Sequence, residues 1–316
     1  MPTLFTIPRE LRDAILGHVV YAAINLPTPT APFDESTRTE ILDLDSQSWG
    51  HGKSVKYLKS SSRLGHFPTL IVNRQIRAET LDLLEKLPNK HSYKMDLMLI
   101  NETDIWATWL SVPLIANRVD EVYVSFRNVG IATNEFNEEY QHEMYAGKSL
   151  LRGGCGGPPY LTWCLYDLLE RFLRYGPTSD LPPELEAPWG AQGTYWQIHG
   201  MRLDDGKYYH HSAHYLAHYV ACDLWMLLRM SDHTGRFGKI LYERIGKIEV
   251  RLDGELIADE EEAYARSIDI AERFDNLKWH GEQRSSKYEW PEKEFERWKP
   301  ATYKKRVEYG LPVISL

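Results

Sequence analysis

Two hydrophobic periodicities alternate along this chain of 316 residues, and this alternation constrains the fold more than any other feature. Apolar residues three to four positions apart predict amphipathic helices, whereas apolar residues at every second position predict strands. Helical spacing occurs at 5–23, 69–87, 161–175, 207–230, 260–277 and 291–308, with shorter helices expected near 37–44 and 103–110. Period-two spacing occurs at 93–100, 119–127, 195–203 and 247–256. The expected fold class is therefore α+β, with a mixed sheet flanked by helices.

Composition shifts divide the chain into two parts. Residues 1–90 contain two helical segments separated by a long Pro- and Ser-rich stretch at 27–63, which we expect to be a loop. Residues 91–316 carry the strands and the remaining helices, and are expected to form an α+β domain. The alternative is one continuous globular unit, because the apolar stripes of the first part need a surface to cover them.

Composition also narrows the class of protein. The formal charge is −8 and the mean hydropathy is −0.46, with no apolar run near the length of about 18 residues that a membrane span needs. The N-terminus lacks the basic and apolar regions of a signal peptide. Three widely spaced cysteines are typical of a reducing compartment. We therefore expect an intracellular protein, cytoplasmic or nuclear, that binds neither membrane nor nucleic acid.

The first helix has a distinctive start. Pro8 suits the first helical position and Glu10 lies in the first turn, before an apolar stripe formed by Leu11, Ala14, Ile15, Val19 and Ala22. The opening phrase Phe5-Thr-Ile-Pro-Arg-Glu-Leu-Arg-Asp-Ala-Ile15 resembles the F-box pattern, in which Leu-Pro-x-Glu-Leu begins a three-helix module. The later phrase Leu70-Ile-Val-Asn-Arg-Gln-Ile-Arg-Ala-Glu-Thr-Leu81 looks like the second half of that module in fungal F-box-like proteins, a group mostly without assigned activity.

The resemblance implies a binding role rather than a reaction. In F-box proteins the module docks on the small adaptor subunit of a cullin–RING ubiquitin ligase, and the rest of the chain captures a protein target. The positions that match the motif are Ile7, Pro8, Glu10, Leu11 and Ile15, which would form the partner-binding surface. The residues alone leave a plainer alternative open, in which the stripe packs against its own domain and Gln75 pairs with Glu79 on a helix face.

A histidine-rich run offers a second kind of function. His210, His214 and His218 follow one another at helical i,i+4 steps, a spacing at which imidazoles can share a metal ion or move protons. The run contains no glutamate and no HExxH pattern, and its histidines border an apolar face. Structural contacts at a domain seam are therefore the alternative, and no metal site is predicted.

A glycine-rich loop precedes the helix at 161–175. Gly153, Gly154, Gly156 and Gly157 surround Cys155, and such a loop lets backbone N–H groups approach an anionic ligand. Cys155 could act as a nucleophile there, but the loop matches no phosphate-binding fingerprint, and a simple connector is the preferred explanation. Together the loop and the histidines define an alternative function, a small-molecule binder or enzyme with both segments lining one pocket. No cofactor is expected.

The C-terminal segment is rich in aromatic and basic residues. Residues 278–306 hold nine Lys or Arg against five Glu, whereas residues 254–275 hold eight acids against two bases. Interleaved aromatic and basic side chains can stack on nucleobases. Pairing between these two oppositely charged segments, with the aromatic side chains wrapped over the core, is the preferred interpretation. The tryptophans at 106, 109, 163, 189, 196 and 225 could line a pocket or fill a core.

Overall fold

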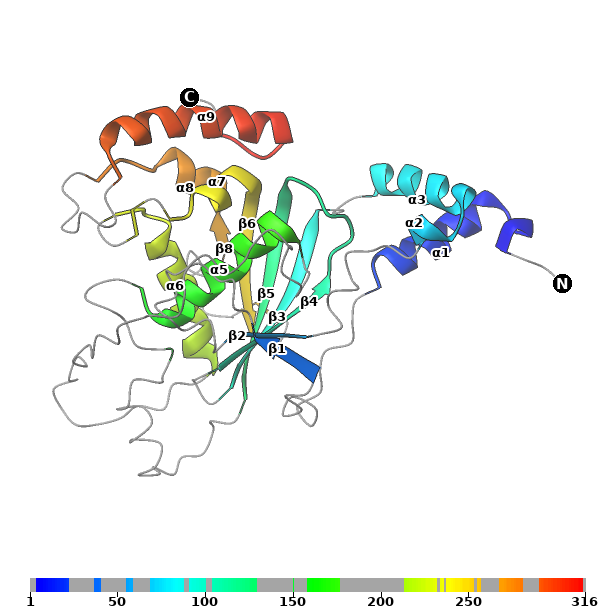
Figure 1. Cartoon of the computed structure of the whole chain (residues 1–316), viewed down its shortest axis with the longest axis horizontal. Coiled ribbons are helices and arrows are strands. Elements are labelled where there is room, and N and C mark those ends of the chain that lie inside the picture. The colour runs from blue at the N-terminus through cyan, green and yellow to red at the C-terminus, as the bar shows by residue number, and fades with distance from the viewer. Residues whose placement is uncertain are drawn as a thin grey trace.

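The computed structural model describes residues 4–22, 37–40, 55–58, 69–87, 91–100, 104–129, 150, 158–176, 213–231, 234–235, 237–252, 255–256, 267–280 and 290–314. Its helices are η1 (Leu4–Thr6, a 3-10 helix), α1 (Arg9–Val20), α2 (Thr69–Val72), α3 (Arg74–Lys86), α5 (Tyr160–Tyr175), α6 (Ala213–Leu227), α7 (Lys239–Arg244), α8 (Ile270–Asp275) and α9 (Glu292–Tyr309). Its strands are β1 (Arg38–Glu40), β2 (Val55–Leu58), β3 (Ser92–Ile100), β4 (Asp104–Ser111), β5 (Val119–Val129), β6 (Ile245–Leu252), β7 (Glu255–Leu256) and β8 (Ser267–Asp269). Figure 1 shows α1, α2 and α3 standing apart from the sheet and its helices.

The strands form one mixed sheet of eight, which confirms the α+β class. Its order is β1-β2-β4-β3-β5-β6-β7, and β8 also pairs with β6. β3, β5 and β6 run parallel to one another, whereas β4 is antiparallel to β3. β3 and β5, which lie at the strands predicted for 93–100 and 119–127, therefore pair in parallel, and the segment between them contains another strand of the sheet.

The helix predicted at 103–110 is wrong, because β4 occupies this segment. Ile105, Ala107 and Trp109 point into the main core, and Trp106 lies in a second apolar cluster with Met98. Both faces of this strand are therefore buried, so its apolar residues run almost continuously and the period of two is hidden. A strand of this kind cannot be distinguished from a short buried helix by periodicity alone.

Three shorter strands were also missed. β1 and β2 lie inside the predicted 27–63 loop, with β1 replacing the start of the expected 37–44 helix, and β8 lies inside the expected 260–277 helix. Each has three or four residues, which is too short to display a periodicity. Val55 and Tyr57 of β2 are nevertheless fully buried beside β4, so tertiary pairing stabilises these strands.

Most of the predicted helices are confirmed. α5 and α9 match their expected segments, α5 ends at Gly176 with a φ of 79°, and α1 and α6 occupy the inner parts of theirs. The helix predicted at 69–87 is divided at Asn73, whose side chain accepts a hydrogen bond of 2.8 Å from the Ile76 N–H and starts α3. The strand predicted at 247–256 corresponds to two strands, β6 and β7, which pair antiparallel with each other. The strand predicted at 195–203 lies outside the described residues.

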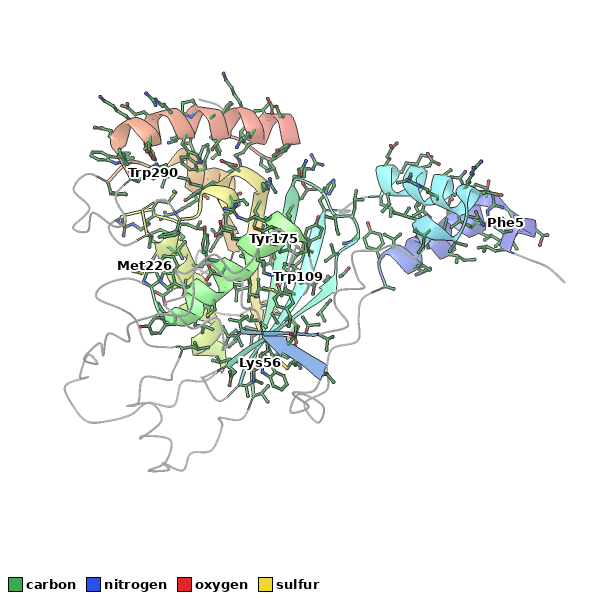
Figure 2. All side chains as sticks on the ribbon, viewed as in Figure 1. Phe5, Lys56, Trp109, Tyr175, Met226 and Trp290 are labelled. Atoms are coloured by element: carbon green, nitrogen blue, oxygen red, sulfur yellow. The ribbon has the colours of Figure 1, made fainter. Side chains whose placement is uncertain are left out.

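The main core lies between the sheet and its helices. α5 and α6 lie on one side of the sheet, and α9 crosses its end above α7 and α8 (Figure 1). Trp109 of β4 stacks on Phe172 of α5, with 3.9 Å between ring centroids. Trp290, which Figure 2 places under α9, is buried with Phe295, and the two rings meet edge to face. The C-terminal aromatic residues therefore cover the core, as the preferred interpretation of the sequence predicts.

Candidate interaction surface

The matches to the F-box motif lie in a group of three helices, α1, α2 and α3, here called the helical unit. α1 packs on α3, and α2 leads directly into α3 (Figure 1). The buried side of α1 carries Arg12, Leu16 and Val20, one turn apart from each other. The buried side of α3 includes Ile76 and Leu84. The two helices thus bury one narrow stripe each.

An ion pair occupies the centre of the contact between α1 and α3. Arg12 Nε and Nη2 donate to the two carboxylate oxygens of Glu79, at 2.8 and 2.6 Å, in a bidentate arrangement. Gln75 donates to the same carboxylate at 3.0 Å, which is the i,i+4 contact expected from the sequence. Arg12 Nη1 also donates to the Ile7 carbonyl at 2.7 Å. Hydrogen bonds from Arg12 and Gln75 lower the pKa of Glu79 to about 2.

A second set of charged side chains pairs beside the Arg12–Glu79 ion pair. Arg9 donates to Asp13 at 2.7 Å and to Asp82 of α3 at 2.6 Å. Lys86 pairs with Asp82 at 2.8 Å from the following turn. The hydrogen bond to Asp13 raises the pKa of Arg9. Polar pairs therefore fix the first half of α1 against α3.

The apolar stripe of α1 faces away from that seam. The side chains of Leu11, Ile15 and Val19 are 56, 43 and 47% exposed, and we call these three residues the docking stripe. Ala14 and Ala22, which belong to the same predicted face, are exposed as well. The alternative, in which the stripe packs against the chain's own domain, does not hold for the described residues, because these side chains stay exposed there. The sequence did not indicate the true buried side because its first residue, Arg12, is charged.

More apolar side chains are exposed nearby on the same unit. Leu4 and Phe5 precede α1 and are 38 and 45% exposed, and Figure 2 shows Phe5 at the end of the unit that lies away from the sheet. Ile71 and Val72 of α2 are 82 and 65% exposed, and neither was predicted as a site residue. Their signal was present in the sequence, because two adjacent β-branched apolar residues just before an Asn N-cap cannot both face the core of so short a helix.

The other predicted positions of this surface surround the docking stripe. Pro8 and Glu10 are exposed, and Ile7 is half-buried. The Pro8 carbonyl accepts the Arg12 N–H at 3.2 Å, which closes the first turn of α1. Ile7, Pro8, Glu10, Leu11 and Ile15 therefore lie between the residue before α1's N-cap and the second turn of α1.

The remaining predicted site residues are not placed by the structure. Gly153, Gly154, Cys155, Gly156, Gly157 and His210 lie outside the described residues. His214 and His218 belong to α6, but their side chains also fall outside the described part of the chain. Within the described ranges, no three His, Cys, Asp or Glu side chains lie close enough together to hold a metal ion. The predicted pocket between the loop and the histidines stays a prediction.

Comparisons of the chain with protein-family models, with curated proteins and with solved structures find no match. The resemblance to F-box-like proteins thus stays a prediction that depends on its motif alone. None of the described helices combines the length and the apolar character needed to cross a bilayer.

Proposed function

We propose that this chain is an F-box-like interaction protein, whose helical unit docks on the adaptor subunit of a cullin-type ubiquitin ligase while the rest of the chain holds a protein target. The observation that carries the proposal is the exposure of the docking stripe. Leu11 and Ile15 match the F-box motif, and both are more than two-fifths exposed. An apolar stripe left open on a folded surface is typical of a protein-binding site.

The polar seam of the helical unit supports the same proposal. Arg12 and Glu79 hold α1 against α3 in one orientation, so the outward position of Leu11 does not depend on loose packing. The stripe has i,i+4 spacing, the pattern with which an amphipathic helix enters an apolar groove. Burying the exposed parts of Leu11, Ile15 and Val19 in a partner is worth about 1 kcal/mol for each residue.

Recovery of the purified ligase adaptor subunit by the immobilised full chain tests the proposal. Leu11→Glu places a charge in the centre of the docking stripe, and we expect it to lower recovery at least about tenfold, because an unpaired carboxylate would be buried in the interface. Val307→Glu is the matched control. Val307 lies on α9, is 53% exposed, and belongs to no part of the helical unit, so this variant should bind as the wild type does.

Two results would overturn the proposal. Equal recovery with wild type and Leu11→Glu would show that the stripe is not the contact surface. Absence of recovery with either protein would show that the ligase adaptor is not the partner. Circular dichroism of both variants checks that α1 and α9 keep their helical structure.

A further inference from the structure

A second exposed apolar surface lies at the end of α6. Trp225 and Met226 are adjacent on this helix and are 37 and 44% exposed. Figure 2 shows Met226 on the side of the molecule that lies away from the helical unit. Scattered apolar side chains are ordinary on a protein surface, whereas adjacent large ones favour contact with a partner.

Two arginines lie over the Trp225 ring. Arg273 of α8 has its guanidinium carbon 3.8 Å from the ring centroid, and Arg229, just after α6, has its guanidinium carbon 5.9 Å from it. Arg273 Nη2 also donates to the Trp225 carbonyl at 3.3 Å, in a hydrogen bond that lies at the surface. The indole ring attracts both cations and so holds them at one place. We call Trp225, Met226, Arg229 and Arg273 the arginine patch.

Neither arginine of the patch has an acidic partner among the described residues. Burial lowers the pKa of Arg273, the like charge of Arg229 lowers it further, and no described carboxylate opposes them. Asp223 lies two residues before Trp225, but it is buried, and burial is the only cause that shifts its pKa. The two neighbouring positive charges are therefore not balanced by a carboxylate in the described part of the chain.

The end of α6 holds Arg229 at the surface. The Arg229 N–H donates to the Met226 carbonyl at 3.1 Å, which closes the last turn. The next residue, Met230, has a φ of 54°, which is uncommon for a residue other than glycine, and its side chain is 3% exposed. Met230 thus anchors the chain in the core, while Arg229 beside it is exposed.

We propose that the arginine patch binds an acidic segment of a partner protein, in which carboxylates alternate with apolar side chains. Carboxylates of the segment would pair with Arg229 and Arg273, whose planar guanidinium groups match carboxylate geometry. Its apolar side chains would cover Met226 and the exposed part of Trp225.

Charge favours a short acidic segment over an extended anion. Nucleic acids and anionic membranes attract broad positive surfaces, whereas the patch has two cations and the whole chain has a formal charge of −8. Within the proposed function, the patch would hold the protein target. Its argument and its test involve no ligase adaptor, so either proposal can fail alone.

Titration calorimetry of the full chain with the capped peptide Gly-Glu-Leu-Glu-Leu-Glu-Gly tests the proposal. We expect saturable binding, and binding at least about tenfold weaker for the same peptide with Gln in place of Glu, because the charge-assisted hydrogen bonds are lost. Added salt should weaken binding of the Glu peptide as well, since the charges lie at the surface.

Variants locate the binding at the patch. Arg229→Met should weaken binding of the Glu peptide about fivefold, and Met226→Ser should weaken it by a smaller factor. Both side chains are exposed, so neither change should disturb the fold. Arg297→Met is the matched control, because Arg297 is an exposed arginine of α9 outside the patch, and this variant should bind as the wild type does.

Several outcomes would overturn the proposal. Equal affinity for the Glu and Gln peptides, or unchanged affinity in Arg229→Met, would exclude carboxylate recognition at the patch. Tighter binding to phosphatidylserine vesicles or to an oligonucleotide would assign it to another anion. Much tighter peptide binding after Gln replaces Glu260, Glu261 and Glu262 would show that the chain itself supplies the carboxylates. Absence of saturable binding to the folded wild type would remove acidic segments as partners.

Discussion

The helical unit and the sheet with its helices, here called the sheet body, distribute polar and apolar side chains in opposite ways. In the sheet body the largest apolar side chains are inside, where Trp109 and Phe172 stack in the core. In the helical unit a bidentate ion pair, Arg12–Glu79, occupies the buried seam, and Leu11 faces outward. In most folded domains the large apolar side chains are buried and the charged ones are exposed, as in the sheet body.

The difference shows what each region contributes. Apolar burial is the main favourable term of folding, so the sheet body supplies most of the stability of the molecule. A buried ion pair stabilises little after desolvation, but it fixes the orientation of the helices that carry it. The helical unit therefore holds its apolar stripe at a defined position, and the free energy of burying that stripe remains available for binding.

The largest expected effect comes from replacing one aromatic side chain in each region and comparing the loss of stability. Trp109→Ala should lower the free energy of unfolding by about 3–5 kcal/mol, because it opens a cavity beside Phe172. Phe5→Ala, on a side chain that is 45% exposed in the helical unit, should change it by less than about 1 kcal/mol. Chemical denaturation followed by circular dichroism measures both. Similar losses in the two variants would contradict the contrast between the regions.

The second prediction concerns a buried acid of the sheet body. Asp223 of α6 is 7% exposed, its Oδ2 has no hydrogen-bond partner among the described residues, and burial raises its pKa to about 6. A carboxyl whose pKa is raised on folding destabilises the protein where it is ionised, so the penalty is complete above pH 6 and disappears as the pH falls to about 4. Asp223→Asn should therefore stabilise the protein by about 1–2 kcal/mol at neutral pH.

The free energies of unfolding of the wild type and of Asp223→Asn, measured at several pH values, show whether the gain comes from the buried charge of Asp223 or from the amide itself. The gain should shrink as the pH is lowered from 7 to 4, because the wild-type carboxyl becomes protonated over that range. A gain that stays constant with pH would show that desolvation of the charge is not its cause.

The sequence predicted the helices of the sheet body better than its strands, and it predicted the docking stripe better than the seam behind it. α5 and α9 were recognisable because their ends carry Pro and Gly signals. β4 was not, because Ile105 and Trp106 are buried on opposite faces and no alternation remains. The pairing of Arg12 with Glu79 joins residues 67 positions apart, and no local pattern in the sequence could connect them.

The third prediction uses the buried acid of the helical unit, whose pKa is shifted in the opposite direction. The pKa of Glu79 is lowered from 4.5 to about 2 by Arg12 and Gln75, so its contribution to stability is present above pH 4.5 and is lost as the pH falls towards 2. Glu79→Gln should therefore destabilise α1 and α3 at pH 7 by a modest amount, and this effect should become small as the pH approaches 2.

The spectroscopic signals allow this loss to be located. The seven tryptophans among the described residues all belong to the sheet body, and none of the ten lies in α1, α2 or α3. Tryptophan fluorescence therefore follows mainly the sheet body, while circular dichroism follows both regions. Glu79→Gln should shift the dichroism transition at pH 7 and leave the fluorescence transition in place. A shift of both transitions together would show that the two regions unfold as one cooperative unit.

The smallest expected effect concerns the docking stripe itself. Leu11→Ser and Ile15→Ser should each change the free energy of unfolding by less than about 0.5 kcal/mol, because their side chains already face solvent. Leu16→Ser is the matched control on the next position of the same helix. Leu16 is 2% exposed against α3, so its replacement should cost about 2–4 kcal/mol of the stability of the helical unit. Equal losses at Leu11 and Leu16 in the circular dichroism transition would mean that the stripe supports the fold, and a stripe that supports the fold is not free to bind a partner.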